Sequence, residues 1–334
     1  ITSRVKILAD LNIAEKRVPQ DGRIKLKMKN KVVDFRVSTL PVIFGEKIVM
    51  RILDQGNLTF DLTSFGFEPK AEKDFMWAIQ RPYGMVLVTG PTGSGKTTTL
   101  YSALSQINSI ETNIMTAEDP VEYNIYGVNQ VLVRNEVGMT FAAALKAFLR
   151  QDPNIIMVGE IRDLETGGIA IKAALTGHLV LSTLHTNDTP STITRLIDMG
   201  LEPFNVASAL NLLSAQRLAR RICKNCKTGT TYEPDFFESA KIPLDWATKT
   251  TFYKGAGCDK CNGSGYKGRC GFYEVMIMST GLRKAIMKEV GTDELRSIAV
   301  SEGMLTLRDD ALKKVERGVT TLDEVVKETT VADE

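Results

Sequence analysis

Short apolar runs alternate with amphipathic segments through the middle of the chain. Four of these runs end in a polar stretch, and they cover residues 85–89, 113–116, 155–158 and 179–183. Segments with a helical pattern lie between them, at residues 97–110, 141–150, 164–175 and 189–199. Alternating strands and helices predict the α/β class, with a parallel sheet that carries helices on both faces. Because ligands bind beyond the carboxyl ends of such strands, we expect the four polar stretches to meet at one site.

The first part of the chain follows a different pattern, a strict alternation of apolar and polar positions. This alternation covers residues 31–39, with Arg36 at a polar position, and returns over residues 47–53, with Arg51 at a polar position. The segment 40–46 contains a Pro and a Gly and suits a hairpin-like connection. We predict antiparallel strands here, whose polar faces are either solvated or part of a binding site.

These two patterns divide the chain into domains. We predict a small α+β domain over residues 1–54, ending at the polar turn Asp54–Asn57, and a linker region over residues 55–74. A larger domain follows over residues 75–334, and it includes a cysteine-rich element at residues 219–275 and a charged helical segment at residues 276–334.

Composition narrows the class of protein. The chain has 334 residues, of which 43% are hydrophobic and 25% charged, which is ordinary for about two soluble globular domains. A formal net charge of +2 excludes a global positive field that would bind nucleic acid or anionic lipid by itself. There is no apolar run of the ~18 residues that a membrane span needs. The chain begins at Ile1 without an initiator Met or signal core, and we expect an upstream part.

One motif points directly to a nucleotide. The sequence GPTGSGKT follows the first apolar run and fits G-x-x-x-x-G-K-[ST], a loop whose backbone N–H groups wrap a phosphate at a helix N-terminus. The alternative is a glycine-rich turn without a ligand. We assign Lys96 to the β- and γ-phosphates of ATP and Thr97 to Mg²⁺. The residues predicted to contact nucleotide are Gly90, Pro91, Thr92, Gly93, Ser94, Gly95, Lys96, Thr97 and Thr98.

Carboxylates follow two other apolar runs. Glu160 stands after the third run and is predicted to orient or deprotonate the attacking water, although Gly159 occupies the place where many P-loop ATPases carry an aspartate. The alternative is a capping or salt-bridging glutamate. After the second run, Glu118, Asp119 and Glu122 form an acidic loop that either faces Mg²⁺ or is a solvated turn.

The two histidines bracket the fourth apolar run. His185 stands at its carboxyl end, where a γ-phosphate would lie, and we predict a role for it in the site. His178 stands at the other end, and its alternative is a hydrogen-bonded structural residue. Seven residues apart along a strand, the two side chains point to opposite faces and cannot share a metal without a bend.

Four of the five cysteines form two C-x-x-C pairs. Cys223 and Cys226 precede an excursion over residues 227–257, and Cys258 and Cys261 follow it. In a chain without secretory features, this spacing predicts a structural tetrahedral zinc site before it predicts disulfides. Cys270 lacks a partner at that spacing and is expected to lie outside the site.

These motifs, in this order, resemble those of the secretion ATPase superfamily of bacterial type II secretion and type IV pilus machines. GPTGSGKT is similar to the Walker A motif of that family, TAEDPVEY to its Asp box, GEIRD to its Walker B motif and TGHLVLSTLHTN to its His box. The Gly before Glu160 is normal in the family. The stretches DFRVSTLP and GEKIVMRILD are similar to its small N-terminal domain, and residues 267–274 to its KGR-x-G-x-x-E element.

The resemblance implies more than the residues alone show. It implies a RecA-like P-loop domain and a ring of six chains, with ATP bound between the two domains. It assigns Arg36 and Arg51 to nucleotide contacts as fingers, and Arg269 to a place near the nucleotide. It also implies a cytoplasmic motor that reaches the inner membrane through a platform protein. The tetracysteine pattern is typical of assembly and secretion members, and the pilus-extension members are the most similar.

Two other functions remain open at this point. The motifs do not separate a pilus-extension motor from a type II secretion or DNA-uptake pseudopilus motor. A zinc-containing nucleic-acid-binding ATPase is the alternative from another class, because basic residues crowd the first C-x-x-C pair, namely Arg217, Arg220, Arg221, Lys224 and Lys227. Its near-zero net charge and the lack of base-stacking aromatics near those positions argue against it, so we expect no nucleic-acid partner.

Overall fold

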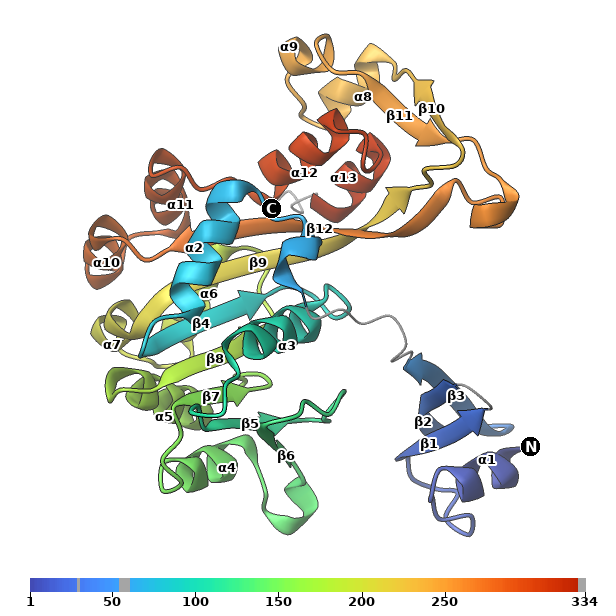
Figure 1. The fold of residues 1–334 in the computed structure, drawn as a ribbon, viewed down its shortest axis with the longest axis vertical. Helices are drawn as coiled ribbons and strands as arrows, with labels where there is room; N and C mark the ends of the chain where they lie inside the picture. The colour runs from blue at the N-terminus through green and yellow to red at the C-terminus, as the bar shows by residue number, and fades with distance from the viewer. Residues whose placement is uncertain (29–30, 54–60, 330–334) are drawn as a thin grey trace. The chain divides into compact units, whose positions relative to one another are not determined.

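A computed structural model describes residues 1–28, 31–53 and 61–329 (Figure 1). The chain divides into two compact units, residues 1–59 and 60–334. The turn Asp54–Asn57, which we predicted as the domain boundary, lies outside the described residues.

The first unit is a three-stranded antiparallel sheet with one helix. Its elements are α1 (Thr2–Leu8), β1 (Gln20–Met28), β2 (Lys31–Val42) and β3 (Gly45–Leu53), in the sheet order β1-β2-β3. Ile24 and Val37 are buried against Ala9 at the end of α1. Asp34, on the strand face that we predicted to be polar, is fully buried, and its carboxylate accepts a hydrogen bond from Arg23 at 3.0 Å. A buried carboxylate needs such a partner because desolvation of an unpaired charge is costly.

The second unit is built on a seven-stranded sheet. Its order is β12-β9-β4-β8-β7-β5-β6, parallel except that β12 runs antiparallel to β9. The strands are β4 (Gly84–Thr89), β5 (Ile114–Glu118), β6 (Val128–Leu132), β7 (Ile155–Val158), β8 (Leu179–Leu184), β9 (Leu210–Ile222) and β12 (Tyr266–Ile277). The predicted α/β class with a parallel sheet is confirmed, and the four predicted strands correspond to β4, β5, β7 and β8. We did not predict β6, β9 or β12.

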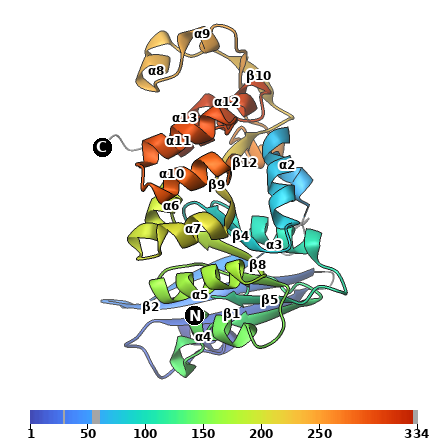
Figure 2. The ribbon, with the colours of Figure 1, turned by 90° about the vertical axis from the view of Figure 1, so that its left-hand side faces the viewer.

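Helices cover both faces of this sheet, as Figure 2 shows. On one face, α2 and α3 bury Phe75 and Leu104, and on the other face α4 to α7, α10 and α11 bury Leu145 and Leu282. The helices are α2 (Pro69–Ile79), α3 (Lys96–Ile107), α4 (Phe141–Phe148), α5 (Leu164–Leu175), α6 (Thr189–Asp198), α7 (Pro203–Ala209), α10 (Thr280–Met287), α11 (Thr292–Ser301), α12 (Leu307–Glu316) and α13 (Leu322–Thr329). Short 3₁₀ helices are η1 (Leu62–Phe65), η2 (Asn135–Val137) and η3 (Asp259–Cys261).

The second unit begins earlier in the chain than we predicted. Residues 55–74, which we assigned to a linker, contain η1 and the start of α2. Leu62 and Phe67 are buried there, and Phe67 packs its ring against Tyr273 of β12 at a centroid distance of 3.9 Å. Within the described part of this segment, Leu62 and Phe67 therefore belong to the core.

The cysteine-rich insertion leaves the sheet between β9 and β12. It contains β10 (Lys227–Thr230), α8 (Pro234–Ser239), α9 (Leu244–Ala247) and β11 (Phe252–Gly255). Phe237 and Phe252 form a small core that continues into Leu307 and Val315 of α12. The predicted range 219–275 was wider than the insertion, because its two ends are strands of the central sheet. Within the ranges that the structure describes, no helix has the length and apolar character needed to cross a bilayer.

Candidate nucleotide site and metal centre

The loop between β4 and α3 has the backbone geometry of a phosphate cradle. Gly90 and Gly95 adopt φ values of 146° and 93°, and a Cβ on Gly90 would lie 2.5 Å from the carbonyl oxygen of Gln216. No side chain caps α3, and its first backbone hydrogen bond runs from Thr99 N to Gly95 O at 3.1 Å. The N–H groups of the first turn are therefore available to an anion at the positive end of the helix. Among the described residues, buried Ser94 Oγ has no hydrogen-bond partner. This geometry fits the phosphates of a nucleotide.

Lys96 lies at the end of this loop, as the sequence predicted, and its burial disfavours the charged amine. Its Nζ donates hydrogen bonds to the carbonyl oxygens of Gly90 at 2.7 Å and Pro91 at 3.0 Å. The pKa of Lys96 is lowered to about 8, mainly because the amine is buried; the charge of Glu160 opposes this shift, and the charge of Arg217 adds to it. A bound phosphate would replace two neutral carbonyl acceptors by a charged one.

Nucleotide binding should therefore depend on pH above neutrality. The charged amine predominates below pH 8, and the phosphates of a bound nucleotide should raise the pKa of Lys96 above about 8. We expect ADP affinity to be nearly constant below about pH 8, the pKa of Lys96 in the free protein, and to fall by up to about tenfold per pH unit between that pH and the higher pKa in the complex. Calorimetry in two buffers of different ionisation enthalpy should detect proton uptake on ADP binding in this range. An affinity that stays constant to about pH 10 would contradict the contact.

A glutamine from β9 supports the cradle, and sequence reasoning missed it. Gln216 Nε2 donates to the carbonyl oxygen of Ser94 at 2.7 Å, and its Oε1 accepts from Thr99 Oγ1 at 2.9 Å. Its neighbour Arg217 donates to the carbonyl oxygen of Asn187 at 3.1 Å, in the loop after β8. A lone Gln in an uncharged stretch gives no local signal, since its role comes from the pairing of β9 with β4.

Glu160 and His185 come together at the carboxyl edge of the sheet. Glu160 follows β7 and His185 follows β8, and His185 Nε2 lies 3.4 Å from Glu160 Oε2. Arg162 contacts the other oxygen of the same carboxylate. Burial lowers the pKa of His185, with a further contribution from the charge of Lys96, so this imidazole is neutral at pH 7. The carboxylate is thus held in one place by two side chains.

The structure also explains the glycine before Glu160. Gly159 N donates to the carbonyl oxygen of Ala117 at 2.8 Å, so β7 and β5 are in close contact here. A Cβ on Gly159 would lie 3.3 Å from that oxygen and 3.6 Å from the Cα of Glu118. An aspartate at this position would press against the end of β5.

The three carboxylates of the acidic loop are in different environments. Glu118 is buried, and its carboxylate accepts hydrogen bonds from Tyr101, from Thr116 at 2.6 Å and from Gln130 at 3.0 Å. The Tyr101 hydroxyl also accepts from the N–H of Glu122 at 3.2 Å. We therefore assign Glu118 to holding the loop on α3 rather than to contact with Mg²⁺. Asp119 is exposed and Glu122 half-buried.

His178 lies at the opposite edge of the sheet from His185. Its Nδ1 is 3.0 Å from the carbonyl oxygen of Ala173, in the last turn of α5. The two histidines flank the two ends of β8, and the hydrogen bond of His178 matches the structural alternative.

The predicted arginines of the first unit lie in one row across its sheet. In register, Arg23 of β1 pairs with Arg36 of β2, and Arg36 pairs with Arg51 of β3. The buried carboxylate of Asp34 accepts a hydrogen bond from Arg23 in this row, and opposite charges side by side stabilise a sheet. We missed Arg23 because β1 was not predicted.

Arg269 lies on β12, opposite Arg220 of β9. Its side chain is exposed, and it lies four positions along the ladder from the pair of Gln216 with Tyr273. Gln216 of β9 contacts the cradle through the carbonyl oxygen of Ser94.

The four cysteines of the two C-x-x-C pairs converge. Their sulfur atoms all lie within 4.8 Å of one another, and three of the distances are 3.7, 3.8 and 3.8 Å. Four ligands about 2.3 Å from a tetrahedral zinc ion are about 3.8 Å apart. Cys270 is not part of this group, and its Sγ faces the carbonyl oxygen of Ala219 at 3.9 Å. The tetracysteine group therefore fits a closed tetrahedral metal site.

Comparison with known proteins is consistent with this geometry. The family model described as "Type II/IV secretion system protein" matches residues 1–327. The chain is 56% identical over 331 residues to the type IV pilus assembly ATPase PilB of Myxococcus xanthus, covering 98% of this chain and 58% of that protein. It is 48% identical to the type II secretion system ATPase E of Vibrio cholerae, covering 98% of this chain and 65% of that protein. The chain thus spans less than two thirds of the length of these curated relatives.

Solved structures show the same fold. The pilus retraction motor PilT with bound ADP is 28% identical, with a TM-score of 0.68 and coverage of 95% of this chain and 79% of that chain. The ATPase DotB of Yersinia pseudotuberculosis is 21% identical, with a TM-score of 0.69 and coverage of 98% and 81%, and this likeness concerns the fold alone.

Proposed function

The chain belongs to the family of type II/IV secretion system proteins, and on that basis we propose that it is the ATPase motor that drives pilin polymerisation in type IV pilus extension. The observation that carries the proposal is the meeting of a phosphate cradle with the Glu160–His185 pair at one edge of the sheet. The identities of 56% and 53% to two pilus assembly ATPases support the pilus assignment.

The residues of the site divide the work of ATP hydrolysis. The N–H groups of the first turn of α3 and the charge of Lys96 bind the phosphates. Mg²⁺ bound at Thr97 would neutralise charge on the β- and γ-phosphates. Glu160 orients the attacking water and accepts its proton, while Arg162 and neutral His185 fix the position of its carboxylate. Glu122 lies on the loop that Glu118 and Tyr101 hold in place, and we propose it as the second carboxylate of the site.

We further propose the assembly that the family implies. In it, Arg36 and Arg51 of the small domain would act as fingers on ATP in a homohexamer. Such fingers contribute about 10³–10⁵-fold to the rate in phosphoryl transfer. The ring would work in the cytoplasm against an inner-membrane platform protein, with Arg269 near the nucleotide and one structural Zn²⁺ per chain.

The second candidate is a type II secretion motor, favoured by the 48% identity to type II secretion ATPase E. A DNA-uptake pseudopilus motor is of the same class. A zinc-containing nucleic-acid-binding ATPase is less well supported, since the net charge is only +2.

A complementation experiment tests the pilus assignment and the ring together. In a strain that lacks the gene, the full-length wild-type gene should restore surface pili, whereas Lys96→Ala and Arg51→Ala should each fail. Co-expression of these two variants should restore part of the piliation, because mixed rings contain sites that combine an intact Lys96 with an intact Arg51 from a neighbour.

The outcomes separate the alternatives. Restoration of enzyme secretion without pili would move the protein to the type II system. If cells that co-express both variants have no more pili than cells with either variant alone, then Arg51 and Lys96 act within one chain, or Arg51 has a structural role.

A further inference from the structure

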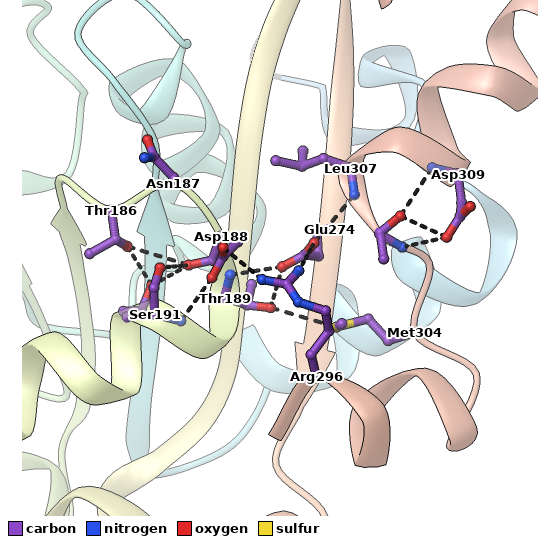
Figure 3. Close-up of polar contacts among 12 residues, drawn as sticks. Thr186, Asn187, Asp188, Thr189, Ser191, Glu274, Arg296, Met304, Leu307 and Asp309 are labelled. Carbon is purple, nitrogen blue, oxygen red and sulfur yellow. Dashed lines mark hydrogen bonds and ion pairs between the residues drawn. The ribbon is translucent and has the colours of Figure 1, made fainter. Parts of the chain in front are cut away.

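Glu274 is a buried carboxylate that the proposed mechanism does not use. It lies on β12 and is 1% exposed. Its Oε1 accepts hydrogen bonds from the N–H of Thr189 at 2.8 Å and from its hydroxyl at 2.6 Å, and its Oε2 accepts from the N–H of Leu307 at 3.3 Å (Figure 3). Thr189 begins α6 and Leu307 begins α12. One carboxylate therefore joins the N-terminal turns of two helices that are distant in sequence, where the helix dipoles favour negative charge.

An arginine from a third helix completes the cluster. Arg296 of α11 contacts Asp188 Oδ2 through Nη2 at 2.9 Å, and its Nη1 is 3.9 Å from Glu274 Oε2. Asp188 in turn caps α6 by accepting from the N–H of Ser191 at 2.8 Å. Desolvation of Glu274 is costly, and the donors from three helices are what make its burial tolerable. The cluster thus fixes the start of α6 against α11 and α12.

Thr189 is the last residue of a short segment, residues 185–189, whose first residue, His185, contacts the carboxylate of Glu160. His185 faces Glu160, and the N–H of Thr186 donates to Thr89 Oγ1 at 2.9 Å, directly before the cradle. Residues 185–189 therefore run without interruption from the site of hydrolysis to the bonds of Glu274. The placement of His185 depends on where this segment is anchored.

We propose that Glu274 is a positioning residue, which anchors residues 185–189 to α11 and α12 so that His185 faces Glu160. The anchor also makes α12 sensitive to the site, because a shift of this segment when ATP binds must move or strain the bonds to Leu307 and Arg296. The inference rests on the proposed ATPase function. It adds a structural connection, through residues 185–189 and Glu274, between the nucleotide site and the helices α11 and α12.

The variant Glu274→Gln tests the anchor at almost constant volume. Its amide nitrogen must face either the N–H of Thr189 or the donors of Leu307 and Arg296, so a donor opposes a donor on one side. Since a displacement of about 1 Å can cost about 100-fold in rate, we expect kcat to fall about 10- to 100-fold while the affinity for ATPγS stays within about twofold. Arg296→Lys, which keeps the charge but loses the planar fork, should change kcat in the same direction by less.

Hydrogen exchange supplies a readout that does not depend on turnover. In the wild type, ATPγS should change the protection of residues 305–312, and in Glu274→Gln this change should be lost. Arg283→Gln is the matched control, because Arg283 joins α10 to the carbonyl oxygens of Ala207 and, at 2.8 Å, Leu210. It should lower stability but retain both kcat and the exchange response.

Each outcome is decisive for the inference. It is overturned if Glu274→Gln loses no more kcat than Arg283→Gln, or if it keeps the ATPγS response of residues 305–312. When one of these two results is found and the wild type still binds ATPγS and hydrolyses ATP, the inference is wrong but the proposed function stands. A wild type that binds no ATPγS would overturn both. If Glu274→Gln does not fold, Arg296→Lys takes its place, and its kcat and exchange response are compared with those of Arg283→Gln.

Discussion

Replacing Glu160 by Gln should abolish steady-state ATP hydrolysis and leave ATP bound. The amide keeps the shape of the side chain but cannot accept a proton from the attacking water, and general-base catalysis contributes about 10²–10⁴-fold. The cradle, including Lys96, is untouched, so phosphate binding should persist. Phosphate release measures the turnover, and equilibrium binding of a fluorescent ATP analogue measures the retained affinity. Lys96→Ala should instead lose hydrolysis because it weakens phosphate binding itself.

Glu165→Gln is the matched control for this change. Glu165 is an exposed residue of α5 that pairs with Lys146 at 2.6 Å, and a surface ion pair contributes at most about 1 kcal/mol. Its hydrolysis rate should equal that of the wild type. If Glu160→Gln hydrolyses ATP as fast as Glu165→Gln, the general base lies elsewhere. Glu122, on the acidic loop, would then be the next candidate.

Changing Cys223 and Cys226 together to Ser should reduce the metal content from about one Zn²⁺ per chain to none. Two hydroxyls do not replace two thiolates as zinc ligands, and the ion ties together the ends of the excursion over residues 227–257. Without it, residues 223–265 should become accessible to protease. Nucleotide binding at Lys96 should persist, because Gln216, which contacts the cradle, lies within β9, and both changed residues come after the end of that strand.

Cys270→Ser is the control for the zinc experiment. Cys270 lies outside the tetracysteine group, so this variant should keep its zinc and its resistance to protease. Elemental analysis and limited proteolysis of freshly purified protein measure the two effects. Zinc retained after the double change, or absent from the wild type, would refute the assignment.

Local patterns were sufficient for part of the fold. β4, β5, β7 and β8 could be predicted because each contains a short apolar run that ends in a polar stretch, and buried parallel strands require such runs. β9 could not, because Arg217, Arg220 and Arg221 interrupt its apolar pattern where it extends toward the insertion. Its partner β12 comes only after that insertion, and pairing over such a separation has no local signal. The predicted linker failed for a similar reason, since Phe67 is buried by Tyr273.

The candidate site shows the same division. Lys96, Glu160 and His185 were found because each follows a strand within a recognisable motif. Gln216 was not found, and Glu274 was noted only as the last residue of the KGR-x-G-x-x-E element with no role assigned, because each acts through a partner more than 80 residues away in the sequence. Arg23 was missed together with its strand, and only the register of β1 with β2 places it beside Arg36.

The sequence by itself determined the chemistry available to this protein: a phosphate-binding loop, a carboxylate after β7, a histidine after β8 and two C-x-x-C pairs. These features depend on residue type and short spacing, which the chain carries locally. The tertiary structure alone decided which groups surround each carboxylate. Glu118, Glu160 and Glu274 are the same residue type, yet Tyr101 and Gln130 occupy the first, His185 and Arg162 hold the second, and Thr189 and Leu307 bury the third. The role of a carboxylate depends on the donors around it, and in a folded chain most of those donors come from other elements.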